Sequence, residues 1–180
     1  MIITRQWAMP NHHTFEIAPI RRLLQKYIYT GLWLDPFNGG YQHEYGMFAD
    51  CRFVTNDLNP KVKADYHEEA LDFLRRFDDT SVDGILFDPP YSLRQVKECY
   101  DGIGKQLTNE IINTLWLREK EEMKRILKPA SYVLVFGWHS NGIGDKEMFE
   151  LIEIMLVAHG GYHNDTICTV QRKVERRVGG

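Results

Sequence analysis

Three short apolar runs in this chain of 180 residues each lead into an aspartate that a proline follows within three residues. The runs are GLWL, CRFVT and DGILF, and the aspartates are Asp35, Asp57 and Asp88. Continuous apolar runs of this length indicate strands buried on both faces, as in parallel sheets of α/β proteins. Ligands of such sheets bind beyond the carboxyl ends of the strands, so three acidic loops at that edge predict one site.

Helical patterns alternate with these runs. FEIAPIRRLLQKYI predicts a helix after Pro19, VKADYHEEALDFLRRF predicts a brief extended piece and then a helix capped near Asp65, and residues 108–127 predict a helix that Pro129 ends. YVLVFGW predicts a further buried strand, and residues 149–173 predict two strands around a Gly-Gly turn, with a helix as an optional start. The order indicates an α/β sandwich whose mostly parallel sheet gains an antiparallel closing hairpin.

The composition limits the number of domains, the compartment and the partners that we expect for this protein. A chain of this size with 43% hydrophobic residues is expected to form a single domain over residues 1–180. Three widely spaced cysteines without a CxxC pair indicate a reducing compartment and give no support for a metal site. No apolar run reaches 18 residues, so we expect a cytoplasmic protein without a membrane partner. With a net charge of −3, a nucleic-acid partner would need a local basic patch.

The first two acidic loops carry features of a nucleotide site. Gly39 lies in DPFNGG, where a glycine lets the backbone approach a ligand closely. Asp57 lies 18 residues beyond Gly39, a spacing that suits an acid binding ribose hydroxyl groups, although an Asx-turn before Pro60 is the alternative. Asp65 could contact an adenine amino group, or it could cap a helix.

The third loop, DPPYS, is the most specific. Two prolines fix the backbone and remove competing N–H groups, so nearby carbonyl groups point in set directions. Asp88 adds an acceptor and Tyr91 adds a flat ring. A carboxylate, a presented carbonyl and a ring together suit a planar amine, with a plain proline-rich turn as the alternative.

DPPY downstream of DPF-x-G resembles the amino-methyltransferases that use S-adenosylmethionine, chiefly the DNA adenine-N6 methyltransferases. The resemblance covers nearly the whole chain, and its compact form is similar to small methyltransferases of phages and mobile elements. It implies a Rossmann-like class I methyltransferase fold with a seven-stranded sheet. It also implies S-adenosylmethionine as cofactor, DNA as substrate, and a bacterial or phage-infected host.

The resemblance also assigns roles to residues of this chain. It implies that the catalytic loop consists of Asp88, Pro89, Pro90 and Tyr91. Residues matching the cofactor-binding positions are Phe15, Asp35, Pro36, Phe37, Gly39, Asp57, Leu58, Asp65 and Asp88. Residues expected near the substrate are Tyr91, Ser92, Arg94, Lys97, Trp138 and His139.

Two features depart from the family pattern. Tyr41 stands where the cofactor loop usually has its last glycine, and no residues remain for a target-recognition domain. Sequence preference would then come from short loops or from an oligomer partner. Other substrates stay open, namely cytosine-N4, RNA or a protein amide. A catalytically silent subunit that binds nucleic acid or supports a partner is the alternative from another class.

Overall fold

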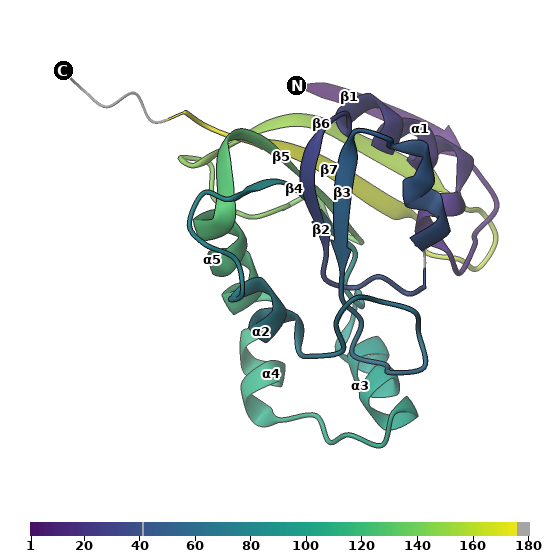
Figure 1. The fold of residues 1–180 in the computed structure, drawn as a ribbon. Coiled ribbons are helices and arrows are strands. Elements are labelled where there is room, and N and C mark those ends of the chain that lie inside the picture. Colours follow the sequence, from purple (N-terminus) through teal and green to yellow (C-terminus); the bar gives the residue numbers. More distant parts are fainter. Residues whose placement is uncertain (41, 176–180) are drawn as a thin grey trace.

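The computed structural model describes residues 1–40 and 42–175, so Tyr41 lies outside the described residues. Its strands are β1 (Ile2–Trp7), β2 (Gly31–Asp35), β3 (Cys51–Thr55), β4 (Val82–Phe87), β5 (Leu127–Gly137), β6 (Phe149–Ala158) and β7 (Thr166–Lys173). Its helices are α1 (Ala18–Tyr27), α2 (Ala70–Leu74), α3 (Leu93–Gly102), α4 (Asn109–Thr114) and α5 (Leu117–Ile126). Two 3-10 turns, η1 (Thr14–Glu16) and η2 (Gln42–Met47), precede α1 and β3 (Figure 1).

The strands form one seven-stranded sheet in the order β1-β6-β7-β5-β4-β2-β3. All neighbouring strands are parallel except β7, which runs antiparallel to both β5 and β6. The predicted fold class is therefore confirmed, with a mostly parallel sheet and an antiparallel C-terminal hairpin.

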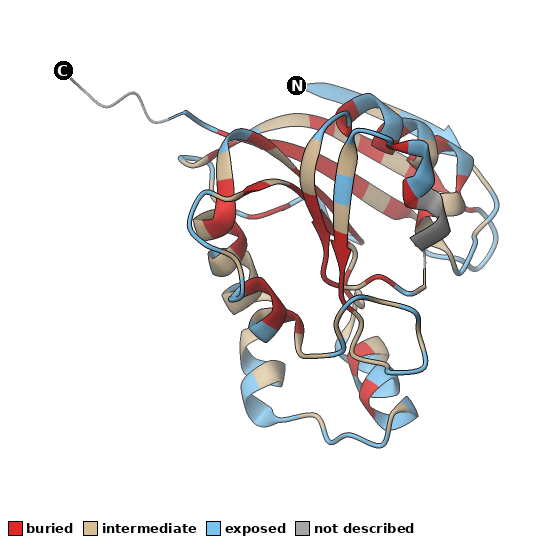
Figure 2. Ribbon diagram, viewed as in Figure 1, coloured by how far each residue is buried: buried red, intermediate tan, exposed pale blue. Residues whose placement is uncertain are grey.

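Helices cover the two faces of this sheet and bury its apolar residues (Figure 2). On one face, α1 buries the stripe that the sequence predicted, formed by Ile20, Leu23, Leu24 and Tyr27. On the other face, α2 and α5 pack together and bury Phe73, Leu74, Met123 and Ile126 against β4 and β5. The 3.6-residue periodicity of α1 is the reason that its apolar stripe could be read from sequence.

One strand of the seven-stranded sheet comes from a different segment than the sequence predicted. The extended piece in VKADY is reduced to a single bridge between Asn56 and Tyr66, and the sheet is completed instead by β1, which pairs with β6. The prediction of a helix capped near Asp65 is also wrong, because α2 begins at Ala70. The Asp65 carboxylate accepts hydrogen bonds from the Thr55 amide (2.8 Å) and hydroxyl (2.9 Å), which fixes it to β3.

The helix expected over residues 108–127 is broken in two. Trp116 lies between α4 and α5 with a φ of 62°, a left-handed conformation that bulky residues rarely adopt. No helix starts the 149–173 segment, since β6 begins at Phe149. Within residues 1–40 and 42–175, no helix has both the length and the apolar character that crossing a bilayer requires.

Gly84 offers a test of packing between β2 and β4. A Cβ atom at this position would lie 2.4–2.5 Å from ring atoms of buried Trp33, its neighbour in the strand register. We expect Gly84→Ala to lower the free energy of unfolding by about 1–3 kcal/mol in urea denaturation, the usual cost of overpacking. Gly102→Ala, with open space around its Cβ, should leave stability within about 0.5 kcal/mol or raise it slightly. Equal stability of the two variants would contradict this packing.

Candidate functional site

The carboxyl ends of β2, β3 and β4 lie side by side. β2 is the middle strand, with Asp35 in register with Thr55 of β3 and Leu34 in register with Ile85 of β4. Because the three strands are parallel, the loops that carry Asp35, Asp57 and Asp88 leave the sheet at one edge. This is the arrangement that the three acidic loops predicted.

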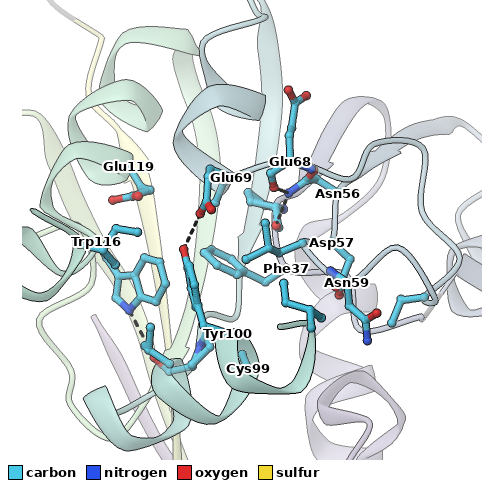
Figure 3. Close-up of a pocket in the computed structure, with 18 residues that line it drawn as sticks. Phe37, Asn56, Asp57, Asn59, Glu68, Glu69, Cys99, Tyr100, Trp116 and Glu119 are labelled. Carbon is cyan, nitrogen blue, oxygen red and sulfur yellow. Dashed lines mark hydrogen bonds between the residues drawn. The ribbon is translucent and has the colours of Figure 1, made fainter. Parts of the chain in front are cut away.

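Two adjoining cavities open at this edge. The outer cavity, about 550 Å³, is lined by His12, Thr14, Phe37, Gly39, Asp57, Asp88, Pro89, Pro90, Tyr91, Gln95, Glu98 and Cys99. The inner cavity, about 280 Å³, is lined by Pro36, Phe37, Asn56, Asp57, Leu58, Asn59, Val62, Glu68, Glu69, Ala70, Pro90, Val96, Cys99, Tyr100, Ile103, Ile111, Trp116 and Glu119 (Figure 3). Phe37, Asp57, Pro90 and Cys99 border both, so one elongated ligand can occupy the two together.

Asp57 holds the glycine loop in place. One carboxylate oxygen accepts the amide N–H of Gly39 at 2.9 Å, and the other accepts that of Asn59 at 2.8 Å. The second bond is the Asx-turn that the sequence left open as an alternative. Gly39 has a φ of 57°, so the loop uses the conformational freedom of glycine. Asp57 therefore shapes the loop and faces both cavities as well.

Asp35 supports the same loop from the core and lines neither cavity. Its carboxyl group is buried and accepts hydrogen bonds from the Phe37 amide (3.2 Å), the Asn38 side chain (3.1 Å) and the Tyr45 hydroxyl. Burial raises the pKa of Asp35 to about 7, although these bonds lower it in part. Asp35, which was predicted to bind the cofactor, thus supports the glycine loop from beneath.

Asp88 and Tyr91 are hydrogen-bonded to each other inside the Asp-Pro-Pro-Tyr loop. The Tyr91 hydroxyl donates to Asp88 Oδ1 at 2.5 Å, and the Tyr91 ring meets the Trp138 ring edge-on, with centroids 5.8 Å apart. Burial raises the pKa of Asp88 to about 6, against the lowering effect of the Tyr91 and Thr14 hydroxyls. A carboxyl group with such a pKa changes charge near neutral pH, which is frequent at functional sites.

Aromatic side chains form the wall of the inner cavity. The Trp116 ring lies edge-on to Phe37, with centroids 4.9 Å apart, and its Nε1–H donates to the Pro90 carbonyl at 3.3 Å. Tyr100 lies across the cavity and donates its hydroxyl to Glu69. Trp116 therefore connects the glycine loop, the Asp-Pro-Pro-Tyr loop and the start of α5.

Besides Asp35, two more of the residues predicted to bind the cofactor lie away from the cavities. The Phe15 side chain is buried in the core against Phe136, with ring centroids 5.2 Å apart, and Thr14 faces the outer cavity in its place. Asp65 is fixed to Thr55 and lines neither cavity. Pro36, Phe37, Gly39, Asp57, Leu58 and Asp88 do line them, as expected for a ligand at this edge.

The predicted substrate residues other than Tyr91 line neither cavity. The Ser92 hydroxyl caps α3 by accepting a hydrogen bond from the backbone N–H of Gln95 at 3.3 Å. Arg94 is exposed and paired with Glu98 at 2.8 Å, and Lys97 is exposed on the same helix. Exposed Trp138 and His139 follow β5, and only Trp138 contacts Tyr91.

Sequence reasoning missed much of the inner cavity, notably Glu69, Tyr100, Trp116 and Glu119. They come from α2, α3 and α5, and no local motif marks them. One signal was present: Glu68 and Glu69 directly follow the extended piece whose carboxyl end should face the site. Among residues 1–40 and 42–175, no group of three His, Cys, Asp or Glu side chains is arranged to hold a metal ion.

The raised pKa of Asp35 predicts how stability depends on pH. The folded protein binds this proton more tightly than the unfolded chain, so protonation stabilises the fold below about pH 4 and this stabilisation is lost as pH rises to about 7. Asp35→Asn should remove about 3 kcal/mol of that decline between about pH 4.5 and pH 8, measured by urea unfolding. Exposed Asp101→Asn is the control. An unchanged pH slope in Asp35→Asn would exclude this role.

Comparison with known proteins shows the fold. Neither the family models nor the curated protein sequences give a significant match to the chain. Among solved structures, TrmN from Thermus thermophilus has a TM-score of 0.62 at 18% identity, and the match covers 88% of this chain and 49% of TrmN. YhhF from Escherichia coli, described as a methyltransferase, has a TM-score of 0.55 at 12% identity, with 88% and 86% covered.

A third structure has a ligand bound. It is 1,6-didemethyltoxoflavin-N1-methyltransferase from Burkholderia thailandensis with bound S-adenosylhomocysteine, with a TM-score of 0.54 at 11% identity and coverage of 88% of this chain and 76% of that one. The chain therefore spans about half the length of TrmN and most of the other two. The α/β fold of this chain is the Rossmann-like fold of methyltransferases.

Proposed function

We propose that this protein is a methyltransferase that uses S-adenosylmethionine and acts on an exocyclic amino group, with adenine in DNA as the leading substrate. The observation that carries the proposal is the position of the Asp-Pro-Pro-Tyr loop, which borders both cavities at the carboxyl end of β4. The shared fold supports the cofactor, because one similar structure holds S-adenosylhomocysteine.

The residues of the two cavities fit such a cofactor. Asp57 retains free lone pairs for ribose hydroxyls, and Gly39 has no side chain to block a close approach. The aromatic and aliphatic wall of the inner cavity suits an adenine ring, while Asp57 and the outer cavity suit the ribose and the amino-acid end. Bound S-adenosylmethionine would supply a methyl group carried on a positively charged sulfur.

Asp88 and a proline carbonyl would prepare the target amine. The lone pair of an exocyclic amine is delocalised into its ring, which makes the nitrogen a poor nucleophile. Hydrogen bonds from its two N–H groups to Asp88 and a carbonyl draw the nitrogen toward tetrahedral geometry and free the lone pair. The Pro90 carbonyl already accepts from Trp116, so the Pro89 carbonyl is the candidate. Positioning then supplies most of the acceleration.

Tyr91 and Trp138 would hold the target base. Tyr91 is hydrogen-bonded to Asp88, and its ring meets the Trp138 ring edge-on. A base that enters must take the place of the Tyr91 or Thr14 hydroxyl at the Asp88 carboxyl group, since both hydroxyls contact it here. A base flipped out of a helix is commonly held by stacking on such rings.

The surface near the outer cavity supports a weak, salt-sensitive contact with nucleic acid. Arg94 is neutralised by Glu98, and the net charge of the chain is −3. Few phosphate contacts give low affinity, so single-stranded DNA should be a better substrate than duplex DNA, whose base must first be flipped out. RNA, cytosine-N4 and a protein amide are the alternative substrates. A second copy or a partner subunit could extend the surface.

The decisive experiment is methyl transfer from labelled S-adenosylmethionine to single-stranded DNA, duplex DNA and RNA of mixed sequence, followed by nucleoside analysis. We expect label in N6-methyladenine, mainly from single-stranded DNA, and less of it at high salt. Binding of the cofactor without transfer to any of these would favour a silent subunit. Label in another nucleoside, or in added protein, would replace adenine as the substrate.

Asp57→Ala should weaken S-adenosylhomocysteine binding by about 1–3 kcal/mol, because a hydrogen-bonding carboxylate and the support of Gly39 are lost together. Isothermal titration calorimetry measures the change. Asp72→Ala, an exposed acid on α2 outside both cavities, is the control and should bind normally. Wild-type affinity in Asp57→Ala would remove Asp57 from the cofactor site.

The raised pKa of Asp88 predicts an acid limb in the rate of methyl transfer. The ionised carboxylate accepts the amine N–H, so activity should fall as pH drops through about 6. Asp88→Asn keeps an acceptor oxygen and does not titrate, so it should lose rate at neutral pH but show no such limb. Asp88→Ala should be inactive. An acid limb that persists in Asp88→Asn would assign it to another group.

A further inference from the structure

Among the described residues, one carboxyl group in the inner cavity has no partner in another residue. Four acidic residues line this cavity, namely Asp57, Glu68, Glu69 and Glu119. Asp57 is bound to two backbone amides, as described above. Among the described residues, the carboxyl group of Glu119 makes no hydrogen bond or ion pair with any other residue, and it is half-buried at the first turn of α5.

The other two glutamates are occupied. Glu68 is paired with Arg76 through two hydrogen bonds, one of them 3.0 Å. Glu69 accepts the hydroxyl of Tyr100. A ligand in the cavity would have to break these contacts with other side chains to use either carboxylate, whereas the Glu119 carboxyl group is hydrogen-bonded to its own backbone amide and to no other described residue.

Glu119 also lies where a base would end. In Figure 3, Glu119 and Trp116 lie at one end of the inner cavity and Asp57 at the other, with Phe37 and Tyr100 between them. A ribose bound at Asp57 would extend its base between these aromatic side chains toward Glu119.

We propose that Glu119 binds the cofactor's adenine through both N1 and the 6-amino group, and so selects adenine at this site. The proposal rests on the proposed function and adds a residue that sets cofactor specificity. The neutral carboxylic acid matches this edge of adenine, because its carbonyl oxygen accepts a proton from the 6-amino group while its hydroxyl donates to N1. The ionised form matches it poorly, since its second oxygen would face the lone pair of N1.

The surroundings of Glu119 favour the neutral form. Burial raises the pKa of Glu119, and the charge of Glu69 at the start of α2 raises it further. Three causes lower the pKa: the hydrogen bond from its own backbone amide, the charge of Arg118, its neighbour on α5, and the charge of Arg75, at the end of α2. On the α3 side, the cavity presents the hydroxyl of Tyr100, which is engaged by Glu69. Affinity for the cofactor should therefore decline as pH rises through the pKa of Glu119.

Two substitutions separate this role from simple packing. Glu119→Gln keeps the size and the pattern of the neutral acid, since an amide also offers one acceptor and one donor. It should bind S-adenosylhomocysteine within about twofold of wild type at low pH, without the decline in affinity at higher pH. Glu119→Ala should bind about tenfold more weakly, the effect of two lost neutral hydrogen bonds.

Calorimetric titration with S-adenosylhomocysteine from about pH 5 to about pH 7.5 measures these affinities. Glu121→Gln and Glu121→Ala are the matched controls, because Glu121 is exposed on the same helix, lines neither cavity and pairs with Lys124. Both controls should match wild type at every pH. Thermal unfolding without ligand shows that each variant is folded.

A modified ligand identifies the atoms involved. The 6-deamino analogue of S-adenosylhomocysteine, which carries purine in place of adenine, lacks the amino group but keeps N1. It should bind wild type several-fold more weakly than the parent compound, and Glu119→Ala should bind both compounds equally.

The possible outcomes distinguish a failure of the proposed function from a failure of the inference about Glu119. No binding of S-adenosylhomocysteine to wild type at any pH would overturn the proposed function and this inference with it. Normal binding by wild type, with equal affinity in Glu119→Ala and the same pH dependence in Glu119→Gln, would overturn the inference alone. A loss of the same size for the 6-deamino analogue in wild type and in Glu119→Ala would also overturn it.

Discussion

The parallel pairing of β2 between β3 and β4 determines the rest of the site. Because Trp33 must pack against Gly84, and Leu34 pairs with Ile85, the ends of the three strands are held at one level. A shift by one residue would turn every buried side chain of β2 toward the opposite face of the sheet. The positions of the glycine loop and the Asp-Pro-Pro-Tyr loop follow from this buried register rather than from contacts between the loops.

At the carboxyl edge of the sheet, two carboxyl groups hold the backbone of the glycine loop, and Asp57 also faces the cavities. Asp35 and Asp57 support the same loop from below and from the side, through the amides of Phe37 and Gly39. The burial that fixes Asp35 also keeps its pKa near neutrality, as it does for Asp88. Asp35 and Asp88 are therefore both weak acids, because burial disfavours their charged forms. Ionisation of either group lowers the stability of the folded protein.

Sequence could predict what depends on local pattern. The buried strands, the apolar stripe of α1 and the three acidic loops follow from periodicity and turn chemistry, and all were found. It could not place Phe15, Asp65 or Trp116, because their surroundings come from distant parts of the chain. Phe15 meets Phe136, and the unusual backbone of Trp116 is held by contacts with Phe37 and Pro90. For the same reason the inner cavity, assembled from several helices, left no motif in the sequence.

The pairing of β1 with β6 has a consequence for the order of folding. The first strand joins a partner about 150 residues away, and closing so long a loop costs about 4 kcal/mol of chain entropy. Residues 8–13 lead from β1 to Thr14, and Ala8 is hydrogen-bonded to Ala158 at the end of β6 and to His159 just beyond it. During synthesis the glycine loop and the Asp-Pro-Pro-Tyr loop emerge before β6, so the N-terminal wall of the outer cavity can close only after the C-terminal hairpin has left the ribosome. All residues that line the inner cavity are thus synthesised before β6, whereas His12 and Thr14 of the outer cavity follow a strand whose partner is synthesised later.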